Sequence, residues 1–398
     1  MVPEVRFKGF SDDWELRKSN EIFSSISEKG HPELPVLSVT QDHGVVKREN
    51  LKIDIKYDKN TLKNYKLVSN GDFIISLRSF QGGFELSKIQ GIVSPAYTVF
   101  KFKNPREHDS EFWKNWFKTF KFIQSLKTIT FGIRDGKSIS FSEFKSLKNI
   151  FPADIKEQEQ IGNLLEKINN TVELQQEKIN LYIKLKKGLL QKQFASDQEK
   201  VPKIRFFNFH ENWEQRKLEK MIDLFSGLTY SPNDIKSSGT FVLRSSNIKS
   251  GNIVNADNVY VDNKVVNSSN VIRGDIIVVV RNGSRALIGK HALVQKSMPE
   301  TVIGAFMTGI RSATPSFTNS LLDTQKFKKE INRNLGSTIN QITNGSLKKM
   351  SFNVPNSLEE KSKIGTSFEI INKIIVMEQE RLNELTSIKK YLLQKLFI

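Results

Sequence analysis

The run KKGLLQKQF at residues 186–194 recurs as KKYLLQKLF at residues 389–397 of this 398-residue chain. At the same shift of 203 positions, residues 154–194 and 357–397 are identical at 16 of 41 positions, where chance gives roughly three at average residue usage. The chain's opening, VPEVRF at 2–7, returns as VPKIRF at 201–206. Internal similarity over this length indicates one structural unit used twice.

Each unit begins with a region of roughly 150 residues that is rich in turn signals and short β-like runs. In the first unit the turn Gly71-Asp72 precedes the apolar run Phe73–Leu77, and in the second Gly274-Asp275 precedes Ile276–Val280. Such runs after a turn predict buried strands. Trp14 recurs as Trp213, and we expect both side chains in the core, because a repeated Trp among Phe residues is usually packing.

A long helix is predicted to close each unit, after Pro152 and Pro355. Apolar residues recur there at steps of three and four, which makes one seam along a helix. About 40 residues at 1.5 Å per residue span on the order of 60 Å. The seam residues are Ile161, Leu165, Ile168, Val172, Ile179 and Leu189 in the first helix, and Ile364, Phe368, Ile371, Ile375, Leu382 and Leu392 in the second.

Two seams of matching length in one chain predict an antiparallel coiled coil between them. A generic dimerisation helix gives the same periodicity, but only residues 195–200 separate the first helix from the second block, which favours an intramolecular spacer. The fold class is therefore mixed α+β with pseudo-two-fold duplication. The predicted segments are a first globular domain at 1–153, a helix at 154–198, a second domain at 199–356 and a helix at 357–398.

The net charge of +18 favours a polyanionic partner such as nucleic acid. The helical stretches 154–198 and 357–398 together carry 14 Lys/Arg and 13 Asp/Glu, so +17 lies on the remainder. The chain has no cysteine, which excludes disulfides and thiolate sites. Its apolar runs are far shorter than a membrane span, and its N-terminus has no signal region, so we expect a cytoplasmic protein with no membrane partner.

The sequence carries no recognisable catalytic motif. The chain has neither a Pro-Pro dipeptide nor a GxGxxG fingerprint, so it lacks the marks of an adenine methyltransferase. The segment Gly132–Ser138 is one residue short of a phosphate loop, and a flexible basic loop near DNA is the better interpretation. The five histidines are scattered without metal-ligand spacing. We therefore expect no catalytic, cofactor or metal site on this chain.

The order of globular block, long helix, globular block and long helix resembles the specificity subunit of type I restriction–modification systems. The resemblance rests on the openings around Trp14 and Trp213, the Gly-Asp-strand-Arg segments, the Pro-then-Glu helix starts and the Leu-Leu-Gln-Lys-x-Phe helix ends. It covers essentially the whole chain. The second helix start departs from the family's Glu-Gln pair, because it has Glu360-Lys361 where the first has Glu157-Gln158.

The resemblance implies that each globular block is a target recognition domain for one half of a split, asymmetric site in double-stranded DNA. It implies that the helices set the spacing of the half-sites and bind two modification (methyltransferase) subunits. Those partners would bring S-adenosylmethionine to methylate adenine. Restriction (translocase/nuclease) subunits would add ATP and Mg, and the chain itself would be a non-catalytic recognition subunit without a cofactor.

Residues expected to contact DNA are polar side chains that follow strands or lie in polar loops. Arg78 and Arg281 occupy equivalent positions after a strand, and an arginine there suits guanine or phosphate. An exposed Arg at a strand end, or Asn and Gly as turn formers, are the structural alternatives. The other candidates are Arg134 and Lys137 in the first unit, and Arg244, Ser245, Asn247, Ser337, Asn340, Gln341 and Asn344 in the second.

Two other classes of protein compete with this interpretation. A stand-alone methyltransferase or nuclease would need a hidden motif, and methyl transfer by the purified chain would reveal it. A structural coiled-coil protein accounts for the helices but not for two related globular blocks, and sequence-independent DNA binding would favour it.

Overall fold

The computed structural model describes residues 2–40, 44–51, 59–76, 83–129, 139–336 and 340–398. The chain divides into two compact units. Unit 1 comprises Met1–Gln176 with Glu380–Ile398, and unit 2 comprises Glu177–Gln379. Both boundaries fall inside the long helices α5 (Ile155–Gln193) and α9 (Leu358–Lys395), so each unit contains a segment of both.

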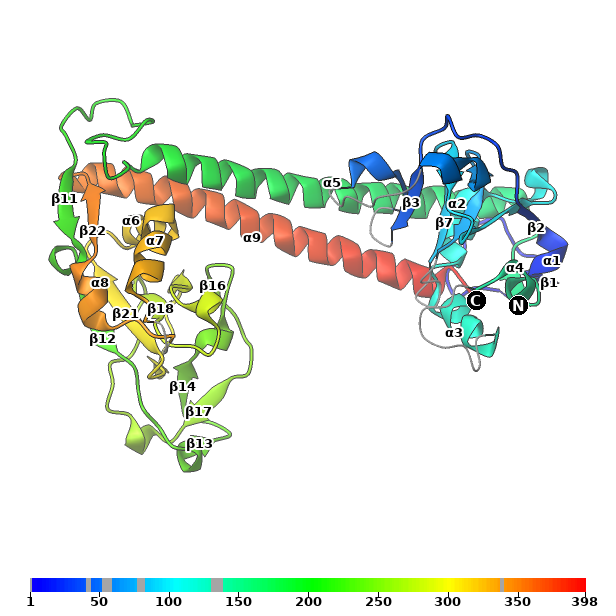
Figure 1. Ribbon diagram of the computed structural model, residues 1–398. Helices are drawn as coiled ribbons and strands as arrows, with labels where there is room; N and C mark the ends of the chain where they lie inside the picture. Colours follow the sequence, from blue (N-terminus) through cyan, green and yellow to red (C-terminus); the bar gives the residue numbers. More distant parts are fainter. Residues whose placement is uncertain (1, 41–43, 52–58, 77–82, 130–138, 337–339) are drawn as a thin grey trace. The chain divides into compact units, whose positions relative to one another are not determined.

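In each unit the two helix segments lie side by side and run in opposite directions (Figure 1). In unit 1, Ile161 and Leu165 of α5 pack in one core with Leu396 and Phe397 from the end of the chain. In unit 2, Phe194 lies 5.9 Å from Phe368 between ring centroids. The antiparallel order predicted from the seams is confirmed within each unit.

The predicted seam is turned inward along both helices. Its buried members are Ile161, Leu165, Ile179, Ile364, Phe368 and Leu382. The others are half-buried, namely Ile168, Val172, Leu189, Ile371, Ile375 and Leu392. Helix α5 ends at Gln193, before the predicted limit of 198, because Phe194 turns into the core of unit 2 beside Trp213 and Phe317.

Unit 1 is built around the four-stranded antiparallel sheet β2-β9-β6-β7, whose core is rich in phenylalanine. Phe23, Phe73 and Phe100 pack edge-to-face or stacked, with ring centroids 5.2 to 6.1 Å apart. The strands are β1 (Glu15–Lys18), β2 (Phe23–Ile26), β3 (Leu37–Thr40), β4 (Gly44–Lys47), β5 (Lys66–Val68), β6 (Phe73–Ile75), β7 (Phe84–Leu86), β8 (Gly91–Val93), β9 (Thr98–Phe102) and β10 (Lys148–Phe151). The shorter helices are α1 (Ser19–Ile22), α2 (Ser110–Trp116), α3 (Phe120–Ile129) and α4 (Phe141–Phe144).

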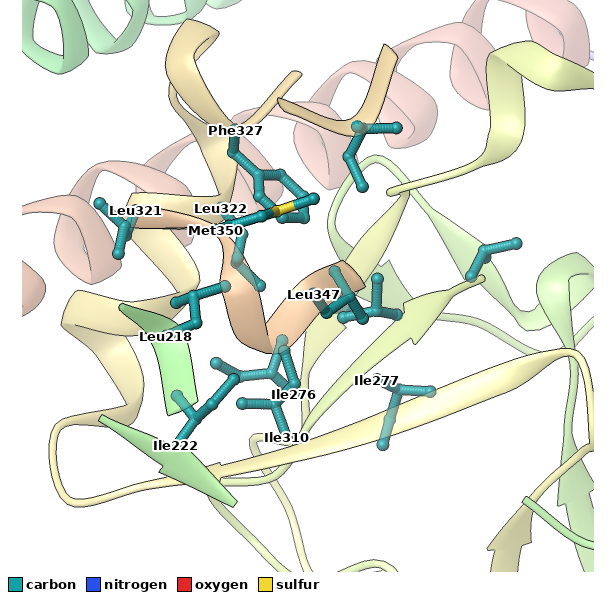
Figure 2. Close-up of a cluster of buried hydrophobic side chains, with 14 of the residues drawn as sticks. Leu218, Ile222, Ile276, Ile277, Ile310, Leu321, Leu322, Phe327, Leu347 and Met350 are labelled. Carbon is teal, nitrogen blue, oxygen red and sulfur yellow. The ribbon is translucent and has the colours of Figure 1, made fainter. Parts of the chain in front are cut away.

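Unit 2 repeats this frame with the sheet β12-β21-β18-β19, but its core is mainly aliphatic. Ile276, Ile310, Leu347 and Met350 belong to this core, and Figure 2 labels them among its buried side chains. The strands are β11 (Glu214–Lys217), β12 (Ile222–Ser226), β13 (Ile235–Lys236), β14 (Thr240–Leu243), β15 (Ile248–Lys249), β16 (Asn252–Ile253), β17 (Val259–Val261), β18 (Ile276–Val279), β19 (His291–Leu293), β20 (Thr301–Ile303), β21 (Met307–Ser312) and β22 (Ser351–Val354). The shorter helices are α6 (Pro315–Asp323), α7 (Gln325–Asn334) and α8 (Asn344–Lys349).

The predicted strands after the Gly-Asp turns are β6 and β18, and every residue of both is buried. Gly71 and Gly274 have φ of +93° and +98°, a backbone conformation that glycine adopts readily. The central sheets of the two units therefore share strand order as well as sequence, which confirms the duplication. Trp14 and Trp213 are 5% and 4% exposed, so their predicted core placement is also confirmed.

An equivalent ion pair joins the first residues of each unit to the start of its long helix. Arg6 Nε lies 2.7 Å from Glu157 Oε1, and Arg205 Nε lies 2.7 Å from Glu360 Oε1. Trp14 and Trp213 each donate an indole N–H to the same carboxylate at 3.3 Å. The Glu of each predicted helix start is thus buried and paired. Among the residues described, no helix is both long and apolar enough to cross a membrane.

Candidate nucleic-acid interface

Arg281 follows the buried strand β18 and lies exposed at the end of the central sheet of unit 2. Its guanidinium carbon is 4.9 Å from the ring centroid of Phe306, whose side chain is 53% exposed just before β21. The Arg281 amide donates to the Phe306 carbonyl at 3.1 Å. Cation–π contact of this kind orients a guanidinium without using its N–H groups. Within the described chain no hydrogen bond or ion pair occupies this guanidinium, so it is available to a ligand.

The polar segment at 340–344 pairs with residues 280–282, which directly follow the inner strand β18. Gln341 forms an antiparallel bridge with Arg281, and the Ile342 amide donates to the Val280 carbonyl at 2.9 Å. Asn340 Nδ2 donates to the Gly283 carbonyl at 2.9 Å, which leaves Asn340 as part of the turn. Gln341 is exposed and next to Arg281, so its amide is placed to read a base edge.

Asn344 and the segment 244–247 are more strongly tied to the fold. Asn344 Oδ1 accepts a hydrogen bond from Thr308 Oγ1 at 2.8 Å. Asn247 is fully buried, and its amide donates to the carbonyls of Val254 and Ala256. Its contacts favour a role in holding the loop rather than in touching DNA directly.

Ser245, preceded by Arg244, lies near the end of β18 because it is hydrogen-bonded to Asn282. Asn282 was not among the residues predicted from the sequence. Asn282 Nδ2 donates to Ser245 Oγ at 3.0 Å, and Asn282 N donates to the Asn340 carbonyl at 3.2 Å. The half-buried Arg244 guanidinium donates to the Asp257 carbonyl. Asn282 therefore joins three segments that are distant in sequence.

The structure thus brings Arg281, Gln341, Asn340 and Ser245 to one region of unit 2. Phe306 and Asn282 belong to this region as well. In the sequence, Phe306 could have been recognised as an aromatic residue between two strand-like runs. Asn282 could have been recognised only by its position directly after Arg281.

Some predicted contacts fall outside the described residues, namely Arg78, Arg134, Lys137 and Ser337. The frame around Arg78 is nevertheless present, because β6 and β7 pair as β18 and β19 do. Ser76 N donates to the Gly83 carbonyl at 2.7 Å at the end of that hairpin. No cluster of three or more His, Asp or Glu side chains suited to a metal ion occurs in the described part of the chain.

The two units therefore share a duplicated sheet-and-helix frame, and in unit 2 a polar, arginine-bearing surface lies at the end of the central sheet. The model of the type I restriction modification DNA specificity domain matches residues 11–185 and 210–387. This chain belongs to that family, which confirms the family expected from the duplicated order of its segments.

Known proteins with the same organisation are distant in sequence. The type I restriction enzyme MjaVIII specificity subunit of Methanocaldococcus jannaschii is 23% identical over 268 residues, covering 64% of this chain and 62% of the relative. The StySPI specificity subunit of Salmonella potsdam is 24% identical over 190 residues, covering 45% and 40%. These matches thus span less than two thirds of the relatives' own lengths.

Solved structures agree in fold over the whole chain. The S subunit of a type I restriction–modification system from M. genitalium has a TM-score of 0.67 at 16% identity, covering 100% of this chain and 99% of that one. A chain from a study of complex assembly and conformational transition of the type I R-M system has a TM-score of 0.54 at 14% identity, covering 97% and 98%.

Proposed function

We propose that this chain is the specificity subunit of a type I restriction–modification complex, and that each unit reads one half of a split DNA target. The observation that carries the proposal is the exposed Arg281–Phe306–Gln341 surface at the end of a sheet that occurs twice in the chain. Arginine pairs bidentately with guanine, and an amide pairs with adenine. Both groups are available to base edges here.

The two half-sites are proposed to be unlike. The frame is shared, but the core of unit 1 is aromatic and that of unit 2 is aliphatic, and the segments around the readers differ. Two different surfaces on one frame predict an asymmetric target. A palindromic target would contradict this proposal.

Two modification subunits are the proposed protein partners, and the helices expose equivalent apolar residues in both units. Leu174 in unit 1 and Met377 in unit 2 are both 66% exposed, and they are related by the shift of 203. Leu185 in unit 2 and Ile388 in unit 1 are related in the same way and are both 50% exposed. A duplicated apolar face suits two copies of one partner, because each copy would meet the same pattern.

The chemistry is proposed to belong to those partners. S-adenosylmethionine would bind the modification subunits, and ATP with Mg would bind restriction subunits, while this chain remains non-catalytic. Methyl transfer by the purified chain without partners would contradict this division of roles.

The first experiment maps N6-methyladenine across the genome of cells with and without this chain. Loss of one split motif, methylated in two unlike halves on opposite strands, is the expected result. If no motif disappears, although the chain copurifies with an active methyltransferase, the proposal is wrong.

The second experiment tests the reading surface in the reconstituted complex. Arg281→Ala should weaken binding to the target by about 1–3 kcal/mol and relax the base preference of one half-site. Arg273→Ala is the matched control, since this exposed arginine precedes the same strand at its opposite end. An unchanged affinity and half-site preference for both Arg281→Ala and Arg78→Ala would contradict the equivalent-arginine hypothesis.

A further inference from the structure

The start of helix α9 carries a buried cation that has no counterpart in unit 1. Lys361 is 7% exposed, and its ammonium has no hydrogen-bond or ion-pair partner in the described residues. Lys361 lies in the first turns of α9, where the helix dipole disfavours a positive charge. Burial lowers the pKa of Lys361, and the Arg216 guanidinium lowers it further. An anion beside this unpaired ammonium would offset the cost of the partial burial of the side chain.

The equivalent position in unit 1 is occupied by a neutral residue whose hydrogen bonds are internal. Gln158 accepts from the Asp109 amide at 3.0 Å and donates to the Glu107 and Pro152 carbonyls. Asp109 in turn caps α2, because its Oδ1 accepts from the Phe112 amide at 2.7 Å. Unit 1 thus supplies its own carboxylate between the ends of two helices.

Unit 2 has lost this carboxylate. Gly162 packs against the start of α2 at Phe112, and Gly365 packs against the start of α6 at Phe317. Phe112 and Phe317 are therefore equivalent, and so are Asp109 and Thr314, which lie three residues before them. Thr314 precedes α6 but makes no side-chain cap hydrogen bond. Relative to unit 1, the site in unit 2 therefore has the neutral Thr314 in place of the negative Asp109. It also has the positive Lys361 in place of the neutral Gln158.

A cavity of about 320 Å³ occupies this place in unit 2. Lys361, Thr314, Arg216 and Lys220 are among the residues that line it. Arg216 is already paired with Glu214 at 3.1 Å, and Glu360 is held by Arg205, so these acids do not neutralise Lys361. Two helix starts, an unpartnered lysine and further basic side chains all favour an anion.

We propose that this cavity binds a small phosphate-class oxyanion that takes the place of the Asp109 carboxylate of unit 1. Lys361 would donate to it, and Arg216 and Lys220 add positive charge to the same cavity. The cavity lies beside Ser312 at one end of β21, whereas Phe306 adjoins the other end. Six residues of strand separate them by about 17–20 Å, so the cavity is distinct from the Arg281 surface, and the DNA-affinity arm of the test below separates a free anion from a DNA phosphate.

The test measures binding of inorganic phosphate to the full chain by calorimetry, with the thermal midpoint followed in phosphate and in chloride of equal ionic strength. The wild-type chain should bind phosphate and gain stability. Lys361→Gln, which installs the residue of unit 1, should weaken phosphate binding by about tenfold or more, as expected for one charge-assisted hydrogen bond. Thr314→Asp should abolish the phosphate effect and raise the midpoint in chloride, because it restores the missing carboxylate.

Two results would overturn the proposal. One is equal phosphate binding by the wild-type chain and both variants, or none by any of them while all remain folded. The other is a Lys361→Gln chain that binds DNA more weakly and whose DNA affinity depends less steeply on salt concentration. That result would assign Lys361 to the DNA backbone. Genome methylation by the Lys361→Gln complex is recorded in parallel, so failure of this site is distinguishable from failure of the proposed DNA-reading function.

Discussion

The duplicated ion pair at the helix starts predicts equal losses of stability from equivalent substitutions in the two units. Glu157 and Glu360 are each 1% exposed at the side chain, and the arginine partners are each 14% exposed. Each arginine makes two hydrogen bonds to its carboxylate, at 2.7 and 2.8 Å in unit 1 and at 2.7 and 2.9 Å in unit 2. Arg6→Ala leaves a buried carboxylate with only the Trp14 N–H, and Arg205→Ala leaves the same arrangement with Trp213.

Removing one partner of a buried pair costs about 3–5 kcal/mol, and partial exposure of the arginines places the expected loss near the lower figure. For units of this size about 3 kcal/mol lowers the thermal midpoint by about 6–12 °C. The assay is urea and thermal unfolding of the full chain, with Arg6→Ala and Glu157→Gln made singly and together. The pair should show a coupling energy of about 2 kcal/mol.

Arg17→Ala is the control, because Arg17 pairs with Glu15 at the surface and both side chains are more than a third exposed, at 40% and 35%. A surface pair is worth about 0–1 kcal/mol. Suppose that Arg6→Ala lowers the free energy of unfolding no more than Arg17→Ala does, or that the coupling energy is near zero. The Arg6–Glu157 pair then does not hold the first residues of the chain on the helix. Unequal losses for Arg6→Ala and Arg205→Ala would refute the energetic equivalence of the units.

The remaining predictions concern pH and packing. Burial lowers the pKa of His108 to about 4, so its contribution to stability is complete above about pH 6.5 and is lost as pH falls toward 4. The free energy of unfolding by urea should be lower at pH 5 than at pH 7 by about 2 kcal/mol, and His108→Phe should reduce this difference; an unchanged difference would mean that other groups cause it. Gly309 in β21 has no room for a side chain, because a Cβ there would lie 2.0 Å from the Phe225 ring. Gly309→Val should therefore cost about 1–3 kcal/mol, and adding Phe225→Ala should recover part of it, whereas a neutral Gly309→Val would show that the ring moves freely.

Much of the fold follows from the sequence because its signals are local and repeated. A seam such as Ile161 to Leu189 defines a helix by spacing alone, and the turn before Ile276 defines a buried strand. The shift of 203 between the two seams then predicts that the frame is used twice. Charge placement assigned the basic surface to the blocks instead of the helices.

Only the tertiary structure decided which polar residues meet. Arg281, Phe306 and Gln341 are separated by 25 and 35 positions in the chain. They meet because β18 pairs with β21, and because Gln341 pairs with Arg281 just after the end of β18. Asn247 looked like a reader by residue type, yet its amide is consumed by carbonyls that come from its own loop. Lys361 stands out in the sequence only as a departure from the Glu-Gln pair, and only the structure shows that its side chain is largely buried in a cavity it shares with Thr314. Hydrogen bonding and burial depend on non-local contacts, which residue spacing along the chain does not encode.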